Sequence, residues 1–357
     1  MGNLLPLPII NGTSKSLLIK NNNIQFSLIQ GYRKTMEDFY SYYIDNKYLY
    51  LALFDGHGGS YVSSYLHNNF LKYLAKSIKS YNIDSYKSID LLYNDIGKVI
   101  KNVYIEIDKL IYDNIDFSKS QGSTVVSTII TNNYIIFSHC GDSPVSAYNG
   151  KNIIYKSIDH KPINKKERDR IIKSGHKIIN NRIDGIIDIS RCLGDFKFKG
   201  LKSAIIPIPV VKIIKKDTCK FFILMTDGIT NFISISEICN YIEYKLQISQ
   251  DISSICDSIL MRAIYNESSD NISICLTVIQ KYMINDTLKN EYDNFIKHVN
   301  KIVVNEIKKK PQIYLNKDPK IIRILKLIKS LDSKSFKFSL AYEFRLISDI
   351  LDKHEIF

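Results

Sequence analysis

The stretch KYLYLALFDGHGG, residues 47–59, joins an apolar run to a polar, glycine-rich segment. Its first eight residues are predicted to form a buried strand. Asp55 then stands where the strand ends, so a rigid sheet can aim its carboxylate, and Gly56 lets the backbone approach closely. A single Asp at a strand end is most often a turn former or a helix cap. Asp55 alone therefore does not indicate a functional site, and the rest of the chain has to be considered with it.

The same arrangement recurs at four other places. Asp227 follows the apolar run FILMT, Asp142 follows YIIFSHC, and Asp270 precedes ISICLTVI. Glu37 and Asp38 follow an apolar segment around residues 26–30. Carboxylates gathered at one place repel each other unless a cation neutralises them, and clusters of oxygen ligands suit Mg²⁺ or Mn²⁺. The sequence does not show whether these groups converge in space.

Apolar periodicity predicts the surrounding architecture. Helical spacing runs through residues 59–80 and 88–113, and only helical patterns remain after about residue 285. Strand-like runs occupy residues 47–54, 123–130, 134–140, 151–155, 221–226 and 272–279. Strand runs that are separate from helical runs favour an α+β fold with antiparallel sheets.

Composition limits the class of protein. The chain has 357 residues, 45% of them hydrophobic, which excludes a largely disordered or collagen-like chain. Its 49 basic and 36 acidic residues give a net charge of +13, which suggests nucleic acid, an anionic membrane or a phosphorylated partner. The six cysteines form no C-x-x-C pair, so buried thiols in a reducing compartment are expected. We find no secretory signal and no membrane-spanning apolar run, and expect a cytoplasmic or nuclear protein.

Eight segments together resemble a known family. They are QGYRKTMED (30–38), FDGHGG (54–59), GSTVV (122–126), GDS (141–143), DHKP (159–162), RIDGIIDISRCLGDFKFK (182–199), TDGIT (226–230) and ESSDNIS (267–273). In this order they resemble the metal-dependent serine/threonine protein phosphatases of type 2C, over about residues 24–280. The resemblance implies a four-layer α-β-β-α sandwich of two antiparallel sheets flanked by helices, with metal ions at one edge.

The resemblance also implies residue roles. Asp55 matches the carboxylate that bridges two ions, Gly56 offers its backbone carbonyl, and Asp227 and Asp270 match ligands of the other ion. Glu37 and Asp38 match acidic residues that hold an ion or its waters, and Asp142 resembles part of a site for a weaker third ion. Arg33 matches the phosphate-binding arginine, and His57 matches the proposed general acid.

The activity implied is hydrolysis of phosphoserine and phosphothreonine in proteins. Two Mg²⁺ or Mn²⁺ ions would supply hydroxide for in-line attack without a covalent intermediate. Arg33 would hold phosphate oxygens, and His57 would protonate the leaving alkoxide. The alternatives are a catalytically weak binding module on the same fold, and a nucleic-acid binder, for which no recognition motif is present.

The chain departs from the family pattern at several positions. Thr230 and Asn231 stand where the family usually has Trp-Asp, and the lost carboxylate puts the third ion in doubt. Pro144 replaces a usual Arg, and Glu267 replaces a usual Gly. The segment at about 160–190 corresponds to a variable flap. Its basic residues either steer a phosphorylated substrate or form a solvated helix face: Lys161, Lys165, Lys166, Arg168, Arg170 and Lys173.

We predict three regions. Residues 1–23 form an N-terminal segment in which Gly2 is a candidate for myristoylation, although Pro6 is unfavourable. Residues 24–285 form the catalytic domain, and residues 286–357 form a helical C-terminal extension. Within the extension, residues 320–331 predict a basic amphipathic helix, which either docks on its own protein or binds a partner or an anionic membrane. Membrane association is expected only through these two features, and a monomer is expected.

Overall fold

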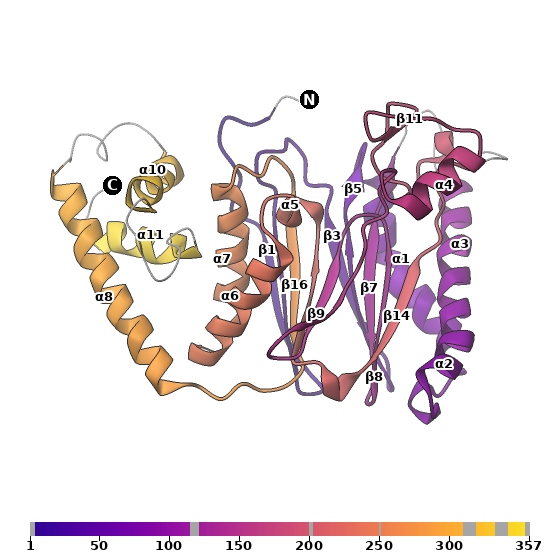
Figure 1. Ribbon diagram of the computed structural model, residues 1–357, viewed down its shortest axis with the longest axis horizontal. Coiled ribbons are helices and arrows are strands. Elements are labelled where there is room, and N and C mark those ends of the chain that lie inside the picture. The colour runs from indigo at the N-terminus through magenta and orange to yellow at the C-terminus, as the bar shows by residue number, and fades with distance from the viewer. Residues whose placement is uncertain are drawn as a thin grey trace.

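The structure is a computed structural model that describes residues 4–114, 121–199, 203–249, 251–309, 319–332 and 342–353. Two antiparallel sheets lie face to face, with helices on their outer faces (Figure 1). This is the expected four-layer α-β-β-α sandwich, with helices of the C-terminal extension on one side. Gly2, the predicted acylation site, lies outside the described residues.

The first large sheet has six strands in the order β1-β2-β16-β15-β9-β10. They are β1 (Thr13–Ile19), β2 (Asn22–Ile29), β16 (Ile272–Val278), β15 (Phe221–Met225), β9 (Val145–Tyr148) and β10 (Ile153–Lys156). The second has the order β14-β8-β7-β4-β3. Its strands are β14 (Val210–Lys215), β8 (Tyr134–Cys140), β7 (Val125–Ile130), β4 (Leu49–Phe54) and β3 (Phe39–Ile44).

Helices cover the outer face of each sheet. The five-stranded sheet carries α1 (Tyr61–Ile78) and α3 (Lys98–Tyr112), and the six-stranded sheet carries α6 (Ile235–Ile248) and α7 (Ile252–Tyr265). The sequence of strand β15 is apolar throughout. Its residues Phe221, Ile223 and Met225 join the core under α6 and α7, while Phe222 and Leu224 face the other sheet. Both faces of the strand are therefore buried.

Two predicted boundaries differ in the structure. The helix expected over residues 88–113 is divided into α2 (Ile89–Leu92), a π-helical turn (Tyr93–Gly97) and α3. The Tyr93 ring packs over Gly97, where a Cβ would stand 3.3 Å from the ring, so the glycine lets the turn widen. In addition, β1 pairs along its whole length with β2, although residues 13–19 were predicted to belong to a separate N-terminal segment.

Two small sheets and a short helix lie at one end of the sandwich. One sheet has the order β13-β6-β5, built from β13 (Leu193–Gly194), β6 (Gly122–Ser123) and β5 (Gly56–His57). The other pairs β11 (Ile178–Ile179) with β12 (Arg182–Ile183), and belongs with α4 (Lys165–Lys173) to the flap. The flap has a small core of its own around Ile171, Ile183 and Ile205.

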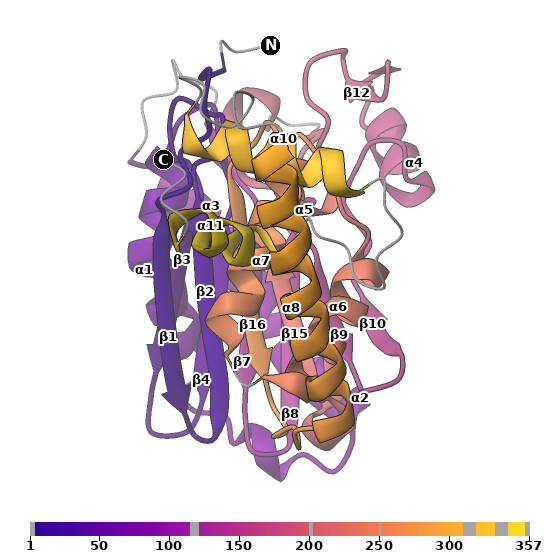
Figure 2. The same cartoon turned by 90° about the vertical axis from the view of Figure 1, so that its left-hand side faces the viewer.

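The C-terminal extension packs on the helices of the six-stranded sheet. Figure 2 shows α8 (Asp286–Lys309) facing the viewer, with α10 (Lys320–Asp332) and α11 (Phe344–Lys353) beside it. The apolar side of α10 is buried: Leu327 and Ile328 are fully inaccessible and share a core with Ile347 of α11 and with α6 and α7. The basic amphipathic helix therefore docks on its own protein.

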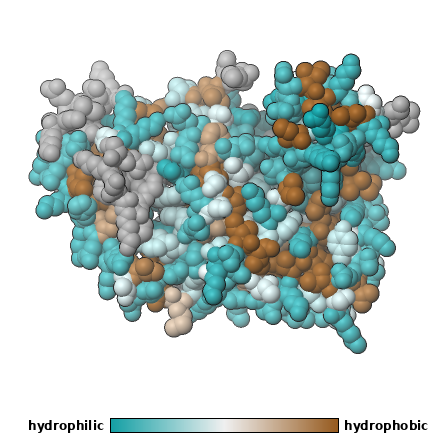
Figure 3. Space-filling view, in the orientation of Figure 1, coloured by the Kyte–Doolittle hydropathy of each residue, from teal (hydrophilic) through white to brown (hydrophobic). Residues whose placement is uncertain are grey.

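Within the described ranges, no helix is both long enough and apolar enough to cross a membrane. Hydrophilic residues cover most of the α8 side of the face drawn in Figure 3.

We expect the Leu327→Ala substitution to lower the free energy of unfolding by ~2–5 kcal/mol, because it leaves a cavity in the core that α10 shares with α6 and α7. The matched control is Leu91→Ala, whose parent side chain is 57% exposed. Urea unfolding of both variants checks the difference. Equal stabilities of the two variants would show that α10 is not part of this core.

Candidate active site

The predicted acidic residues meet at one end of the sandwich. Asp38 precedes β3, Asp55 lies between β4 and β5, Asp142 follows β8, Asp227 begins the short helix α5 (Asp227–Thr230), and Asp270 precedes β16. In Figure 1 this end lies at the top, near the labels β5 and α5. Burial raises the pKa of Asp55, and the charges of the other four carboxylates raise it further.

The loop from Gln30 to Asp38 is tied to the loop before β16 by Asn271. Its side-chain amide donates to the carbonyls of Gln30 and Thr35, at 2.9 and 3.0 Å, and its Oδ1 accepts from the Glu37 N–H at 2.8 Å. Asn271 thus holds Glu37 and Asp270 at the same edge. The sequence analysis gave Asn271 no role, although its position directly after Asp270 was a usable signal.

Glu37 and Gly56 lie in close contact. The Glu37 carbonyl accepts from the Gly56 N–H at 3.2 Å and from the Ser63 hydroxyl at 2.6 Å, while its Oε2 accepts from the Gly59 N–H at 3.1 Å. A Cβ on Gly56 would stand 2.5 Å from the Glu37 carbonyl oxygen. Only glycine fits there, because any side chain would separate the two loops.

Asp38 is buried and hydrogen-bonded to two hydroxyls. Its Oδ2 accepts from Ser273 at 2.6 Å and from Thr226 at 3.2 Å, which links it to β16 and to the end of β15. Burial raises the pKa of Asp38 to about 7, against the opposing effect of the Ser273 hydroxyl. Burial and repulsion among the carboxylates also raise the pKa values of Asp55 and Asp227.

Arg33 lies at the rim of the cluster. Its Nη2 donates to Asp270 Oδ2 at 2.7 Å, its Nε donates to the Ser269 carbonyl, and 46% of its side chain is exposed. A planar guanidinium that is anchored and still exposed is suited to a doubly charged anion. The anchor places it beside the carboxylates, not on a remote surface.

Asp142 has a cationic neighbour from the flap. Lys161 Nζ lies 3.4 Å from Asp142 Oδ2. The position of Lys161 is fixed through His160, whose N–H donates to the Gly141 carbonyl and whose Nδ1 accepts from the Gly141 N–H. Asn231, at the position of the missing carboxylate, donates to Asp227 Oδ2 at 2.9 Å.

Two other residues that depart from the family pattern, Glu267 and Pro144, make defined contacts. Glu267 has a φ of 69°, the left-handed backbone that favours the glycine it replaces, and its carboxylate accepts from Lys329 of α10 at 3.0 Å. Pro144 lacks an N–H, but its carbonyl accepts from the Met225 N–H at 3.0 Å.

His57 is held by a residue that the sequence analysis missed. Its Nε2 lies 2.5 Å from Asp195 Oδ2. In the small sheet, His57 and Gly194 both lie opposite Gly122, and a Cβ on Gly122 would come within 2.7 Å of the His57 and Asp195 side chains. Gly122 therefore leaves the space in which the pair meets. Burial lowers the pKa of His57, but the bond to Asp195 and the charge on Asp195 outweigh it and raise this pKa above its usual value.

Asp195 itself adopts a left-handed backbone with φ 50°, directly after β13. The buried Cys192 thiol donates to the same Oδ2 at 3.2 Å. The segment RIDGIIDISRCLGDFKFK, which carried part of the family resemblance, contains Asp195 directly after Cys-Leu-Gly, and this was the available signal.

The residues fit divalent metal ions. Six carboxylates lie at this edge: Glu37, Asp38, Asp55, Asp142, Asp227 and Asp270. In the part of the chain that the structure describes, the cations paired with them are Arg33 and Lys161. The donor atoms are oxygens, which Mg²⁺ and Mn²⁺ prefer over nitrogen and sulfur. Further cations would relieve the repulsion that raises these pKa values.

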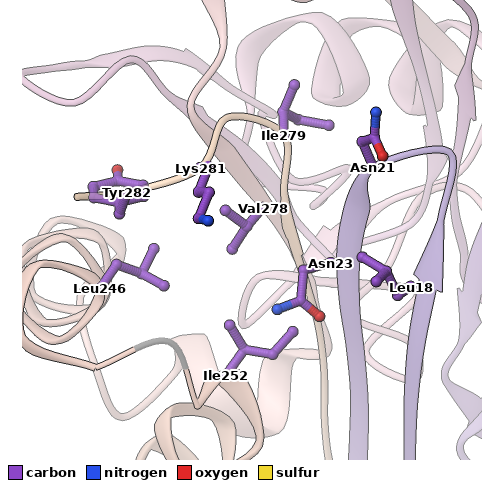
Figure 4. A pocket seen from close by; sticks show the side chains of 9 residues that line it. All are labelled: Leu18, Asn21, Asn23, Leu246, Ile252, Val278, Ile279, Lys281 and Tyr282. Atoms are coloured by element: carbon purple, nitrogen blue, oxygen red, sulfur yellow. The ribbon is translucent and has the colours of Figure 1, made fainter. Parts of the chain in front are cut away.

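A cavity of about 580 Å³ lies at the other end of β16, away from Asp270 (Figure 4). Its lining is mostly apolar and amide: Leu18, Asn21, Asn23, Leu246, Ile252, Val278, Ile279, Lys281 and Tyr282. None of these lining residues is a carboxylate or a histidine, so we look for the catalytic groups at the acidic edge.

An α-β-β-α sandwich with carboxylates and an arginine at one edge defines a class of phosphatase folds. A family model described as "Protein phosphatase 2C" matches residues 22–272. The chain belongs to the protein phosphatase 2C family.

Known proteins of similar sequence are also named protein phosphatases. The chain is 28% identical over 274 residues to human "Protein phosphatase 1B", and the matched region covers 71% of this chain and 57% of that protein. It is 26% identical over 275 residues to bovine "Protein phosphatase 1A", covering 72% and 71%. The chain thus spans little more than half the length of the human relative.

Solved structures share the fold. A phosphatase from a pathogenic strain of Toxoplasma gondii has a TM-score of 0.63 at 19% identity, covering 75% of this chain and 96% of that one. A Caenorhabditis elegans sex determining protein has a TM-score of 0.62 at 20% identity, covering 72% and 65%.

We expect the Asp55→Asn substitution to raise the melting temperature of the metal-free chain, because it removes one buried charge from the repelling set. Each ~1 kcal/mol of relief corresponds to ~2–4 °C in a chain of this size. Mn²⁺ should raise the melting temperature of the parent and have little effect on the variant. Calorimetry in chelator and in Mn²⁺ checks both results.

The matched control is Asp169→Asn, an exposed carboxylate on α4, which should change neither melting temperature nor the response to Mn²⁺. A less stable metal-free Asp55→Asn chain that still responds to Mn²⁺ would contradict the repulsion argument.

Proposed function

We propose that the chain is a protein serine/threonine phosphatase. The observation that carries this proposal is the convergence of four carboxylates around Asp55, with Arg33 and His57 at the rim. The family relationship supports hydrolysis of phosphoproteins. The alternative, a catalytically weak binding module, would be favoured by missing carboxylates, and none of the predicted ones is missing.

The residues that would hold the ions are Asp55, Gly56, Asp227 and Asp270, with Glu37 and Asp38 beside them. Bound as two ions, Mg²⁺ or Mn²⁺ would supply a water of lowered pKa, so that hydroxide is available near neutral pH. Asp38 cannot move freely toward an ion, because Ser273 and Thr226 hold its Oδ2. This leaves its other oxygen for an ion or a coordinated water.

Arg33 would bind the phosphate, and its anchor on Asp270 places the guanidinium beside the metal ligands. His57 would act as the general acid toward the serine or threonine oxygen. With Nε2 engaged by Asp195, proton donation falls to Nδ1. The Asp195 carboxylate stabilises the imidazolium and fixes the plane of the ring.

We propose that a third ion binds at Asp142 more weakly than the other two. Lys161 already places a positive charge 3.4 Å from this carboxylate, and Asn231 adds no charge. Calorimetry that counts three tightly bound Mn²⁺ ions per chain would contradict this proposal.

Substrate steering falls to part of the flap. Arg170 is engaged within the flap by Glu167 and by the carbonyls of Ser190 and Ala204. Lys165, Lys166, Arg168 and Lys173 are exposed and could attract a phosphorylated protein. We propose no nucleic-acid partner.

The wider assignments remain proposals. We infer a cytoplasmic or nuclear monomer that acts in signal transduction, with a catalytic region at 24–285 to which β1 adds an edge strand, and an extension at 286–357. Because the apolar side of α10 is buried, membrane association through this helix would use only its basic edge. Acylation of Gly2 would be the other route.

The direct test is hydrolysis of a phosphothreonine peptide with Mn²⁺. The parent chain should release phosphate, and Asp55→Ala should reduce kcat/KM by at least ~10²-fold, since it removes the carboxylate shared by both ions. Asp90→Ala, at an exposed position of α2, is the control. Equal activity in the parent and Asp55→Ala would reject the site, and an inactive parent that binds no Mn²⁺ would favour the binding module.

The role of Asp195 is separable by leaving group. Asp195→Asn should reduce kcat on a phosphoserine peptide by ~10²-fold or more, because the alkoxide needs a proton. The same variant should lose less than ~10-fold on p-nitrophenyl phosphate, whose leaving group needs none. Steady-state kinetics on both substrates check this. Equal losses on both would indicate that Asp195 is merely structural.

A further inference from the structure

A second group of potential metal ligands lies beside the acidic cluster and has a different chemistry. His57, Cys192 and Asp195 offer one nitrogen, one sulfur and one oxygen, and all three atoms lie within 4.8 Å of one another. The two hydrogen bonds converge on a single atom, Asp195 Oδ2, from His57 Nε2 at 2.5 Å and from Cys192 Sγ at 3.2 Å. This group was not predicted from the sequence, because His57 lies 138 positions from Asp195 and the three residues form no zinc-type spacing.

We propose that these three residues form an inhibitory site for Zn²⁺. Nitrogen, sulfur and one carboxylate oxygen form the donor set that zinc binds, whereas Mg²⁺ and Mn²⁺ prefer oxygens alone. Tetrahedral zinc places its ligand atoms about 3.3–3.8 Å apart, given bond lengths of ~2.0–2.3 Å. Sγ and Oδ2 are nearly at that separation, and Nε2 needs to move away from Oδ2 by about 1 Å.

The surroundings make such a site accessible but enclosed. Cys192 is fully buried and Asp195 is 1% exposed, whereas 32% of the His57 side chain is exposed at the rim. Zinc would therefore enter past His57, with its fourth position toward water. Gly122, which has no side chain, leaves the space that the His57 and Asp195 side chains occupy. Lys199 does not oppose the ion with an unpaired charge, since its Nζ is paired with Asp108 at 2.7 Å.

The binding step balances as an exchange of protons for metal. One Zn²⁺ is bound through His57 Nε2, the Cys192 thiol releases one proton to solvent, and any proton on Nε2 leaves with it. Zinc at Nε2 would separate the imidazole from Asp195 Oδ2, the contact that fixes the plane of the ring. Zinc would therefore take His57 out of the orientation in which it acts on the leaving alkoxide. This consequence rests on the proposed phosphatase function, whereas the binding itself does not.

The test uses Co²⁺ as a spectroscopic substitute for zinc, with the full chain in saturating Mg²⁺ so that the oxygen cluster is occupied. The parent should show a thiolate-to-cobalt charge-transfer absorption that one equivalent of Zn²⁺ abolishes. Cys192→Ser should lack this absorption, because it replaces the thiol with a hydroxyl of similar size. Cys256→Ser, a change of another buried thiol on α7, should keep it. A parent without the absorption, or a Cys192→Ser chain that retains it, would overturn the site.

Inhibition of the phosphatase activity by zinc provides an independent test of the site. Zinc should inhibit the parent without relief from added Mn²⁺, and Cys192→Ser should need at least ~10-fold more zinc for half-inhibition, with each rate expressed relative to the zinc-free rate of the same variant. Cys192→Ala should behave in the same way if serine distorts the loop. Inhibition unchanged by either substitution, and relieved by Mn²⁺, would place zinc in the oxygen cluster and refute the proposal. If the chain has no phosphatase activity, the cobalt spectrum still decides.

Discussion

Buried carboxylates that face one another repel, and the active edge of this protein depends on how that repulsion is contained. Six acidic side chains come from five segments of the chain, and burial raises the pKa of five of them. Hydroxyls from β15 and β16 hold Asp38, Arg33 holds Asp270, and Lys161 faces Asp142. These contacts fix the positions of the charges but do not neutralise them all. Divalent cations bound at this edge would neutralise the remaining charge.

The sandwich provides the rigidity that this requires. Strands β4, β8 and β15 are buried on both faces, so the residues that follow them cannot shift independently of the core. Glycines permit the remaining close approaches, most clearly at Gly56 and Gly228, where a Cβ would stand within 2.5 Å of a backbone oxygen of another loop. The extension completes the core on the outer face of α6 and α7, and Lys329 of α10 contacts Glu267, three residues before Asp270.

The sequence predicted the parts of this fold that obey periodic patterns. Runs such as FFILMT and ISICLTVI are strands because both faces are buried, and the motif residues Asp55, Asp227 and Asp270 lie at their ends. The structure differs from the prediction at the π-helical turn Tyr93–Gly97, which apolar periodicity does not specify, and at β1, a mostly exposed strand that pairs with the adjacent β2 across a two-residue turn. It also missed Asp195 and Asn271, since their roles depend on contacts with residues 138 and 234 positions away. The net charge of +13 had suggested nucleic acid, an anionic membrane or a phosphorylated partner, but the site itself is acidic, and exposed lysines and arginines are spread over α1, α4, α8 and α10.

The central claim is that the acidic edge holds divalent cations around Asp55. Crystals grown with Mn²⁺ and measured at the manganese absorption edge would locate the ions directly by anomalous scattering. The account predicts two anomalous peaks on either side of the Asp55 carboxylate, one near the Gly56 carbonyl and one near Asp227 and Asp270. Crystals that contain Mn²⁺ but show no peak among these residues would contradict it.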